Sequence, residues 1–600
     1  MTCAFLAFVA LSALFLTCRG AIYQNFSDLP TTHFDFVVVG GGTGGNVVAN
    51  RLTEHANFSV LVIEAGGSNE GVLDTIVPFF GPIASPGTPW DWNYTTTPQI
   101  GLNGRAVAFP RGRILGGSSS INYLIYTRGS RDDYDRYARF SGDLGWSWDA
   151  IQPYIHKNEN WTQPADGHNT TGQFNPLFHN STGITSVSLN GFPECIDGRV
   201  IKTTQHLPDM FPFNLDMNSG NTVGLGWTQA TINKGQRSSS ATSYLGPKFI
   251  DRPNLAVLLN TQVSRVISTN SSAEFPVFLD VELSQDNGRT LHVVTASKEI
   301  ILSAGSVGTP YILMNSGIGN CTELALAGVP CKLNLPSVGK NMSDHALLVN
   351  SWFVNSNCTF EAAARNATLE QEELQQWNTT ETGPLVATVI DHLAFLRLPK
   401  NASIFKRFPD PSAGPTSAHY EMAFANGFIG PLPPNGSFLT IGTVIASPAS
   451  RGSVGINSRN PFDPPAIDPG YLTVEYDLFT MREAVKAAKK FLAAKPWHGY
   501  VLRPFGALAD ANSDAEVEAY VRNNTATIYH PVGTSSMTMK GADFGVVDPD
   551  LRVKGVHGLR IVDASVIPFV PSAHTQAPTY IFAERASDLI KADWLPWEGV

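Results

Sequence analysis

The sequence predicts an α/β fold in which a Rossmann-like dinucleotide-binding domain carries an inserted α+β substrate-binding domain. A buried, mostly β-branched run over 36–39 leads directly into a glycine-rich loop. A second apolar run over 60–63 ends in an acid, Glu64. Strand-like runs return only after long intervals, the last at 559–563. The nucleotide-binding domain is therefore expected to be assembled from separated segments.

The glycine-rich loop is expected to hold the pyrophosphate of a dinucleotide. Gly40, Gly42 and Gly45 have G-x-G-x-x-G spacing, and a helix is predicted over 46–54. Gly40 permits the tight turn, Gly42 lets a pyrophosphate approach the backbone, and Gly45 lets helix and strand pack closely. The helix N-terminus offers unpaired N–H groups to phosphates, and Glu64 suits a ribose diol. The alternative is a βαβ unit whose glycines serve only the turn.

The N-terminal end and the many glycosylation sequons predict export. Residues 3–16 are almost wholly apolar, and small residues precede a cleavage point near Gly20. The run is too short for a membrane span and is typical of a signal peptide, assigned to 1–20, and no later stretch predicts a membrane segment. The chain is expected to be secreted, extracellular and N-glycosylated. The sequons begin at Asn25, Asn57, Asn93, Asn160, Asn169, Asn180, Asn270, Asn320, Asn341, Asn357, Asn366, Asn378, Asn401, Asn435 and Asn523.

Charge and cysteine usage exclude several classes of partner. The net charge is −10 at pH 7, and because an acidic protein repels phosphate backbones, no nucleic-acid partner is expected. Outside the predicted signal peptide, Cys195, Cys321, Cys331 and Cys358 show no C-x-x-C spacing, so no metal site is expected. Cys321 and Cys331 are the nearest pair for a disulfide, but sequence alone leaves the pairing open.

Apolar periodicity and capping residues predict the remaining elements. A Gly- and Ser-rich turn is expected within 111–129, and Ser513 with Glu516 forms a capping box. Residues 355–381 are expected to form an exposed helix or insertion, and 408–434 an ordered lid or cavity wall rather than a regular core element. Strands are expected at 255–267, 300–305 and 559–563, and helices at 309–314, 478–492, 514–523 and 579–592.

Two histidines are candidates for acid–base chemistry. His530 ends an apolar run before Pro531, and His574 lies in a loop after the last predicted strand. Ligands bind at the strand ends of doubly wound sheets, and an imidazole titrating near neutral pH suits a general base. Either histidine alone is more often structural, but a neighbouring dinucleotide site favours catalysis.

These motifs resemble, in the right order, those of the GMC (glucose-methanol-choline) oxidoreductases, which are FAD-binding flavoenzymes. The resemblance extends from about residue 34 to 592. It rests on the loop at 40–45, a first signature at 112–129, a second at 305–319, the stretch 339–345, and Asp563 with the His574 segment. Within the family the chain is most similar to fungal aryl-alcohol oxidases, in 91–97, 236–240 and 395–399.

The resemblance implies a GMC, p-hydroxybenzoate-hydroxylase-like architecture. The FAD-binding domain would occupy 34–345 with substrate-lobe insertions near 131–240, the substrate-binding lobe 346–540, and a return to the FAD-binding domain 541–600. FAD should be non-covalent, because Ile121 stands where relatives attach it through histidine. Aryl-alcohol oxidases often carry histidine at the place of Asn122, a change that should leave FAD binding intact. The implied FAD-binding residues are Gly40, Gly42, Thr43, Gly45, Glu64, Arg113, Gly116, Ser119, Asn122, Tyr123, Val263, Asp563, Ala564, Thr575 and Gln576.

By the same resemblance, the chain would oxidise small aromatic and allylic primary alcohols to aldehydes. His530 would take the hydroxyl proton as hydride passes to the flavin, and His574 would hydrogen-bond the alcohol oxygen. Electrons would then pass to O2, giving hydrogen peroxide. Such an enzyme needs no partner beyond alcohol and O2, and a monomer is expected.

A gate of aromatic side chains is expected to close the active site over planar substrates. Tyr123, Phe428 and Tyr529 are its predicted members. Core packing is an equal alternative for Phe428, and Ile429 is an alternative match to the family's gate aromatic, which would widen the entrance. Glu421 resembles an acid near that gate, with a surface charge as the alternative.

Three other functions fit the same resemblance. One is a different GMC enzyme, acting on sugars or furfural alcohols, and another is a dehydrogenase that avoids oxygen. A hydroxynitrile lyase would keep FAD without redox turnover. A non-catalytic flavin-binding protein is disfavoured because both histidines are present.

Overall fold

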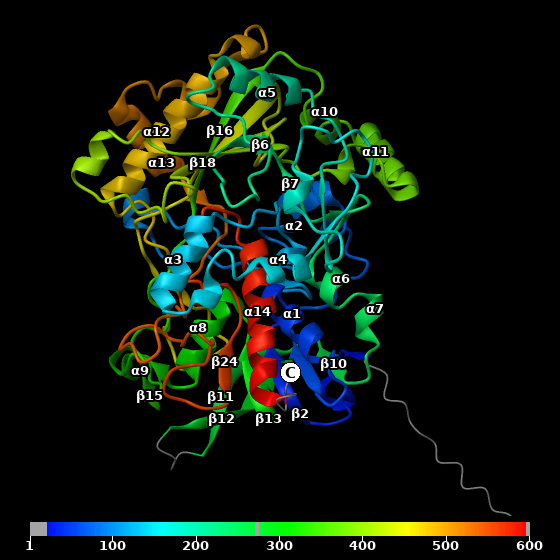
Figure 1. Cartoon of the computed structure of the whole chain (residues 1–600), viewed down its shortest axis with the longest axis vertical. Helices are drawn as coiled ribbons and strands as arrows, with labels where there is room; N and C mark the ends of the chain where they lie inside the picture. Colours follow the sequence, from blue (N-terminus) through cyan, green and yellow to red (C-terminus); the bar gives the residue numbers. More distant parts are fainter. Residues whose placement is uncertain (1–20, 271–274, 596–600) are drawn as a thin grey trace, which may run out of the picture.

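The chain folds around two β-sheets that lie one above the other in Figure 1. The computed structural model describes residues 21–270 and 275–595, so the predicted signal peptide lies outside the described residues. The strands of the first sheet come from residues 21–302 and 559–561, and those of the second from 346–527. The predicted domain division stays a prediction, and β1 joins the first sheet ahead of the predicted start at 34.

The first sheet has eight strands and is mostly parallel. The side chains of Phe36 to Val39 are buried on both faces, as a central parallel strand requires. The order is β1 (Ala21–Tyr23), β10 (Leu255–Leu258), β3 (Val60–Ile63), β2 (His33–Val39), β13 (His292–Leu302), β12 (Val277–Ser284) and β11 (Gln262–Asn270), with β24 (Leu559–Ile561) also paired to β13. The single strand predicted over 255–267 is wrong, since two separate strands occupy it.

Helices from both ends of the chain cover this sheet. α1 (Thr43–Leu52) follows β2 through the glycine loop, and α8 (Gly305–Asn315) follows β13. α14 (Gln576–Trp594), red in Figure 1, packs against α1. The expected helices at 46–54, 309–314 and 579–592 are thus confirmed, and the C-terminal residues return to the first sheet.

The second sheet has six strands and is antiparallel. It contains β17 (His392–Leu396), β18 (Tyr420–Ala425), β19 (Ser437–Ile445), β16 (Ala346–Val354) and β22 (Val501–Pro504), with β23 (Ala526–Thr527) paired to β16. α12 (Glu475–Leu492) packs on β19 and contacts α13 (Asp514–Asn524), whose Ser513–Glu516 capping box is confirmed. The irregular lid expected over 408–434 is wrong for β18, which is buried throughout.

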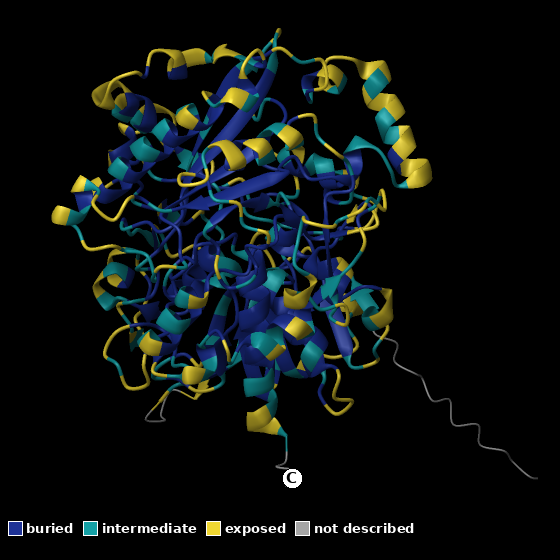
Figure 2. Ribbon diagram, turned by 45° about the horizontal axis from the view of Figure 1, so that its top comes forward, coloured by how far each residue is buried: buried dark blue, intermediate teal, exposed yellow. Residues whose placement is uncertain are grey.

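The segment predicted to be an exposed helix forms two helices. α10 (Glu361–Ala364) and α11 (Ala367–Thr380) lie at the upper right of the molecule in Figure 1, and most residues of α11 are exposed, as Figure 2 shows. The described residues contain two disulfides, Cys321–Cys331 and Cys195–Cys358. Across the described residues, no helix combines the length and hydropathy needed to cross a bilayer.

Smaller helices and strands complete the described part of the chain. The helices are α2 (Gly81–Ala84), α3 (Arg131–Ser141), α4 (Gln152–Asn158), α5 (Asp197–His206), α6 (Ser240–Tyr244), α7 (Pro247–Ile250) and α9 (Cys321–Leu326). The strands are β4 (Glu159–Trp161), β5 (Thr185–Leu189), β6 (Gly224–Trp227), β7 (Gln229–Ala230), β8 (Ile232–Asn233), β9 (Gln236–Arg237), β14 (Ile318–Gly319), β15 (Leu333–Asn334), β20 (Ser453–Gly455) and β21 (Ala466–Asp468).

Candidate active site

A cavity of about 1170 Å³ extends from the first sheet to the second. Its walls include the carboxyl ends of β2, β3 and β13, where doubly wound sheets bind ligands, and the inner faces of β16, β18 and β19. Pockets for a single small ligand usually measure roughly 300–1,000 Å³. The cavity is therefore large enough for a cofactor and a separate substrate.

The glycine loop forms one end of the cavity. Gly40 has φ +107°, and a Cβ there would lie 2.5 Å from Ser303 O. A Cβ on Gly45 would lie 2.0 Å from Gly40 O, so only glycine allows the contact of α1 with the loop. A Cβ on Gly42 would have its nearest neighbours at 3.9 Å, which leaves the loop open toward the cavity. The turn and packing roles predicted for Gly40 and Gly45 agree with this geometry.

Two helix N-termini reach the same cavity. α1 begins at Thr43 and α8 at Gly305, and both residues line the wall. Apart from its chain neighbours and the backbone of its own helix, no atom of the described residues lies within 4 Å of a Cβ built on Gly305. Asp563 accepts hydrogen bonds from Gly305 N at 2.9 Å and Thr309 Oγ1 at 2.6 Å. Open glycines and the positive N-terminal ends of two helices suit a phosphate-bearing cofactor.

Glu64 lies at the cavity wall with both carboxylate oxygens already engaged. Oε2 accepts a hydrogen bond from Gly41 N at 3.0 Å, and Oε1 accepts one from Gly66 N at 2.8 Å. Burial raises the pKa of Glu64 to about 7, against the effect of these backbone hydrogen bonds. Each oxygen keeps a second lone pair, so the bond to a ribose stays a prediction.

The structure brings most predicted site residues to this one cavity. Those among the lining residues are Gly40, Gly42, Thr43, Glu64, Ser119, Asn122, Tyr123, Val263, Phe428, Tyr529, His530, Asp563, Ala564, His574, Thr575 and Gln576. Gly45, Arg113 and Gly116 are not among them. The Arg113 guanidinium lies over the Trp92 ring, 5.3 Å from its centroid, and a Cβ on Gly116 would lie 2.2 Å from Ser120 Oγ. These three residues do not line the cavity, Gly45 has the packing position predicted for it, and the FAD contacts of Arg113 and Gly116 stay a prediction.

The two predicted histidines face each other inside the cavity. The ring centroids of His530 and His574 are 4.7 Å apart, and the residues are 8% and 6% exposed. His574 Nε2 lies 2.9 Å from Glu421 Oε1. Glu421 lies on β18 and is 1% exposed, so the surface-charge alternative for it is wrong.

A third histidine, His345, was not predicted as a site residue. Its Nδ1 lies 3.0 Å from His530 Nδ1, and its Nε2 lies 3.1 Å from the carbonyl oxygen of Ala446. The sequence signal was the Asp344–His345 pair in the stretch 339–345, to which sequence reasoning gave no role.

Asp344 fixes the backbone of both neighbouring histidines. Its Oδ1 accepts hydrogen bonds from His345 N at 2.9 Å and His530 N at 2.8 Å. Its Oδ2 accepts from Thr527 Oγ1 at 2.8 Å and from the Tyr471 hydroxyl. Burial raises the pKa of Asp344, while these hydrogen bonds and the charge of Arg111 oppose the rise.

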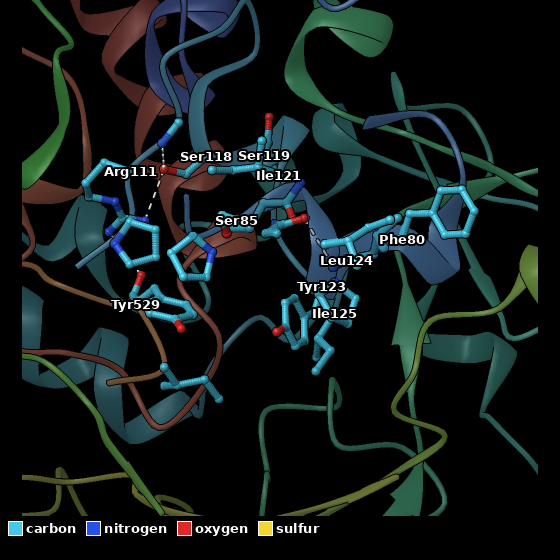
Figure 3. Close-up of a pocket in the computed structure, with 18 of the residues that line it drawn as sticks. Phe80, Ser85, Arg111, Ser118, Ser119, Ile121, Tyr123, Leu124, Ile125 and Tyr529 are labelled. Carbon is cyan, nitrogen blue, oxygen red and sulfur yellow. Dashed lines mark hydrogen bonds between the residues drawn. The ribbon is translucent and has the colours of Figure 1, made fainter. Parts of the chain in front are cut away.

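The predicted gate residues also line the cavity. Figure 3 shows Tyr529 on the side of Arg111 and Tyr123 next to Ile125. Tyr529 has φ +69°, an unusual conformation for a bulky residue. Arg111 Nη1 holds it by donating to Tyr529 O at 3.0 Å. Phe428 and Ile429 both line the wall. Because Phe428 also packs on Phe438 and Phe505, the structure gives it a packing contact beside its predicted gate role.

A buried guanidinium lies behind the cavity wall. Arg237 Nη1 donates to Asn122 Oδ1 at 2.7 Å, and Asn122 Nδ2 donates to Gln576 Oε1 at 2.6 Å. Within the described residues, Nε and Nη2 of Arg237 have no hydrogen-bond partner. Burial lowers the pKa of Arg237 to about 9. A buried cation with unpaired donors favours an electron-rich or anionic group in the adjoining cavity.

The cavity, the glycine loop and the histidine pair define a flavin-dependent oxidoreductase. Comparison with known proteins supports this class. The family models for the N- and C-terminal parts of GMC oxidoreductases match residues 34–347 and 448–583. The chain therefore belongs to the GMC oxidoreductase family. It is an FAD oxidoreductase acting on CH–OH donors, and the open glycine loop and the two helix N-termini at the cavity wall fit FAD.

Relatives and solved structures cover almost the whole chain. Dehydrogenase eriK of Hericium erinaceus is 40% identical, covering 97% of this chain and 98% of its own. A pyranose dehydrogenase of Agaricus campestris is 41% identical, with 96% and 97% covered. The structure of an Aspergillus oryzae RIB40 formate oxidase variant, studied for FAD modification, is 28% identical with TM-score 0.85 and coverage of 94% and 98%. A fungal aryl-alcohol oxidase is 26% identical with TM-score 0.80 and coverage of 94% and 100%.

Proposed function

We propose that this protein oxidises small alcohols with His530 as the catalytic base and His574 as the partner of the substrate oxygen. The observation that supports this most directly is the pair of buried imidazoles facing one another in the cavity, 4.7 Å between ring centroids. FAD, when bound, supplies a two-electron acceptor for the substrate C–H.

The electrostatic environment of His530 suits a base. Burial lowers the pKa of His530 well below its ordinary value, and the charge of His574 when protonated lowers it further. The imidazole is therefore neutral at neutral pH and has a lone pair for the hydroxyl proton. Proton removal raises the electron density on the oxygen and makes the neighbouring C–H a better hydride donor.

Aromatic and allylic primary alcohols are the proposed substrates, with aldehydes as products and O2 reduced to hydrogen peroxide. The part of the cavity on the second sheet is lined by small and apolar side chains, including Ala423 and Ala425 of β18. Tyr123 and Tyr529 add flat rings that suit a planar substrate. The likeness to a fungal aryl-alcohol oxidase supports this assignment.

A pyranose is the second candidate substrate, with an acceptor other than O2. Two observations favour it. Several relatives at 39–41% identity are named pyranose dehydrogenases, and carboxylates line part of the cavity, namely Glu194, Glu361, Glu370 and Glu373. Carboxylates accept hydrogen bonds from sugar hydroxyls.

Anaerobic flavin reduction tests both candidates in one experiment. Purified holoprotein is mixed with 4-methoxybenzyl alcohol or with glucose, and bleaching of the flavin absorbance is followed. Fast bleaching by the aromatic alcohol supports the first candidate, and bleaching by glucose alone supports the second. Failure of both, and of allylic alcohols, contradicts alcohol oxidation and leaves a redox-inactive lyase. Turnover with O2 or with benzoquinone then identifies the acceptor.

The proposal includes a secreted, N-glycosylated monomer that needs no nucleic acid, metal or membrane. The sequons and apolar N-terminal run support export. Expression in a fungal host tests it: the protein should appear in the medium, lose mass on deglycosylation and sediment as a single chain. Retention inside the cell contradicts the export assignment.

A further inference from the structure

We propose that His345 is a positioning residue that holds His530 in the tautomer with its proton on Nδ1 and its lone pair on Nε2. This inference rests on the proposed role of His530 as the base. It goes further in assigning which nitrogen takes the substrate proton and which residue decides this.

The two imidazoles and one backbone carbonyl form a series of hydrogen bonds. Ala446 O lies 3.1 Å from His345 Nε2, and His345 Nδ1 lies 3.0 Å from His530 Nδ1. This hydrogen-bond series ends at the cavity, because His530 is a lining residue and His345 is not. Within the described residues, no hydrogen bond involves His530 Nε2, which leaves this nitrogen for a substrate.

Both imidazoles are neutral, so each carries one N–H. Burial lowers the pKa of His345 to about 3 and that of His530 well below its ordinary value. The charge of His574 acts in the same direction on both residues. Two neutral rings provide one donor and one acceptor nitrogen each.

The position of each proton then follows from the contact between His345 Nε2 and Ala446 O. A carbonyl oxygen only accepts, so the proton of His345 must be on Nε2, and its Nδ1 is an acceptor. The contact between the two Nδ1 atoms needs one donor, which can only be His530. The proton of His530 is therefore on Nδ1, and its Nε2 has the lone pair.

The other groups around the rings are compatible with this assignment. Asp344 bonds the backbone N–H groups and not the imidazoles. Glu421 bonds His574, and the charge of Arg111 lowers the pKa of His530 further. The carbonyl of Pro571 faces His345 together with that of Ala446 and also favours a protonated nitrogen on this ring.

The arrangement also acts after proton transfer. When the alcohol O–H bond breaks, its proton moves to His530 Nε2; FAD, when bound, would accept the C–H hydride with its electron pair, which leaves a carbonyl. His530 is then a cation that donates from Nδ1 to His345. Hydrogen bonds from charged donors are stronger than neutral ones, so His345 stabilises the protonated base more than the resting base.

Two matched variants separate this role from a structural one. Asn at position 345 places an oxygen acceptor near the site of Nδ1, whereas Leu has a similar shape without an acceptor. We expect His345→Leu to slow anaerobic flavin reduction about tenfold, the value of one lost hydrogen bond, with KM within about twofold of wild type. His345→Asn should stay within about threefold of wild type. FAD content and melting temperature should match in the two variants.

Nitrogen NMR tests the tautomer without any substrate. In protein labelled with 15N-histidine, the His530 signals are identified by their loss in His530→Gln, and Nε2 should have the shift of an unprotonated nitrogen. The proposal is overturned if Nε2 is protonated in the wild type, if His345→Leu reduces its flavin at the wild-type rate, or if His345→Asn is as slow as His345→Leu. If no alcohol reduces the flavin, the proposed function fails, and the NMR spectrum alone still decides the tautomer.

Discussion

Arg128 and Glu159 form a buried ion pair. We expect neutralisation of the Glu159 carboxylate to lower the free energy of unfolding by a measurable amount. The Arg128 guanidinium and the His179 imidazole contact Glu159, and together they lower its pKa from 4.5 to about 2 despite burial. At about 1.36 kcal/mol for each pH unit, this difference corresponds to about 3 kcal/mol of stability at pH 7. Leaving the buried Arg128 charge without its carboxylate, although Phe178 O and Asn218 O still accept from Nη1, gives a similar figure of about 3–5 kcal/mol.

The variant Glu159→Gln should therefore melt at a lower temperature than the wild type. With an unfolding entropy of about 2.1 cal/mol/K per residue, 3 kcal/mol lowers the melting temperature of this chain by about 2 °C. Scanning calorimetry or flavin fluorescence of the holoprotein measures the shift. Glu372→Gln, on the exposed face of α11, is the matched control and should leave the melting temperature unchanged.

The stabilisation by Glu159 should depend on pH in one direction. Because folding lowers the pKa of Glu159, its stabilisation is complete above pH 4.5 and is lost as the pH falls toward about 2. The difference between wild type and Glu159→Gln should shrink over that window. Equal melting temperatures at pH 7, or a difference that grows on acidification, would refute the reasoning. Thr127 precedes Arg128 in the chain, and its hydroxyl accepts a hydrogen bond from His574 N at 2.7 Å. Because Glu159→Gln removes the ion pair of Arg128, it should also disturb His574 and slow flavin reduction.

Three further substitutions test the site. His530→Ala should retain FAD but lose about 10²–10⁴-fold in alcohol-dependent flavin reduction, measured by stopped flow; near-normal reduction contradicts the base assignment. Gly45→Ala should lower FAD content and cost about 1–3 kcal/mol, because its Cβ would lie 2.0 Å from Gly40 O, whereas Gly198→Ala, with open space at its Cβ, should be neutral. Arg237→Met should weaken FAD binding, which titration of the apoprotein with FAD measures. The apoprotein should be as stable as the wild type or more stable, because a buried cation with no counter-ion among the described residues is removed. A less stable apoprotein contradicts this account.

Local sequence patterns predicted the cofactor end of the fold. The roles of Gly40 and Gly45 depend on neighbours within one βαβ unit, and their spacing alone indicates them. Glu64 likewise follows β3 directly. The histidines were found because Pro-rich loops after apolar runs place them at strand ends.

Long-range contacts could not be read from the sequence. His345 and His530 are 185 residues apart, and only the fold shows that their rings touch. Cys195 and Cys358 are separated by 163 residues, too far for spacing to indicate the bridge. β18 was misread as a lid, because Pro and Gly on both sides obscured a short buried strand.

The C-terminal return to the first sheet has a consequence for biosynthesis. Among the described residues β24 and α14 are the last strand and the last α-helix, and Asp563, His574 and Gln576 lie between the start of β24 and the end of α14. Chain segments emerge from the ribosome in sequence order. The nascent polypeptide therefore cannot assemble a complete nucleotide pocket until residues 559–594 have been made, so flavin loading follows their synthesis and a chain truncated before residue 559 should yield colourless protein.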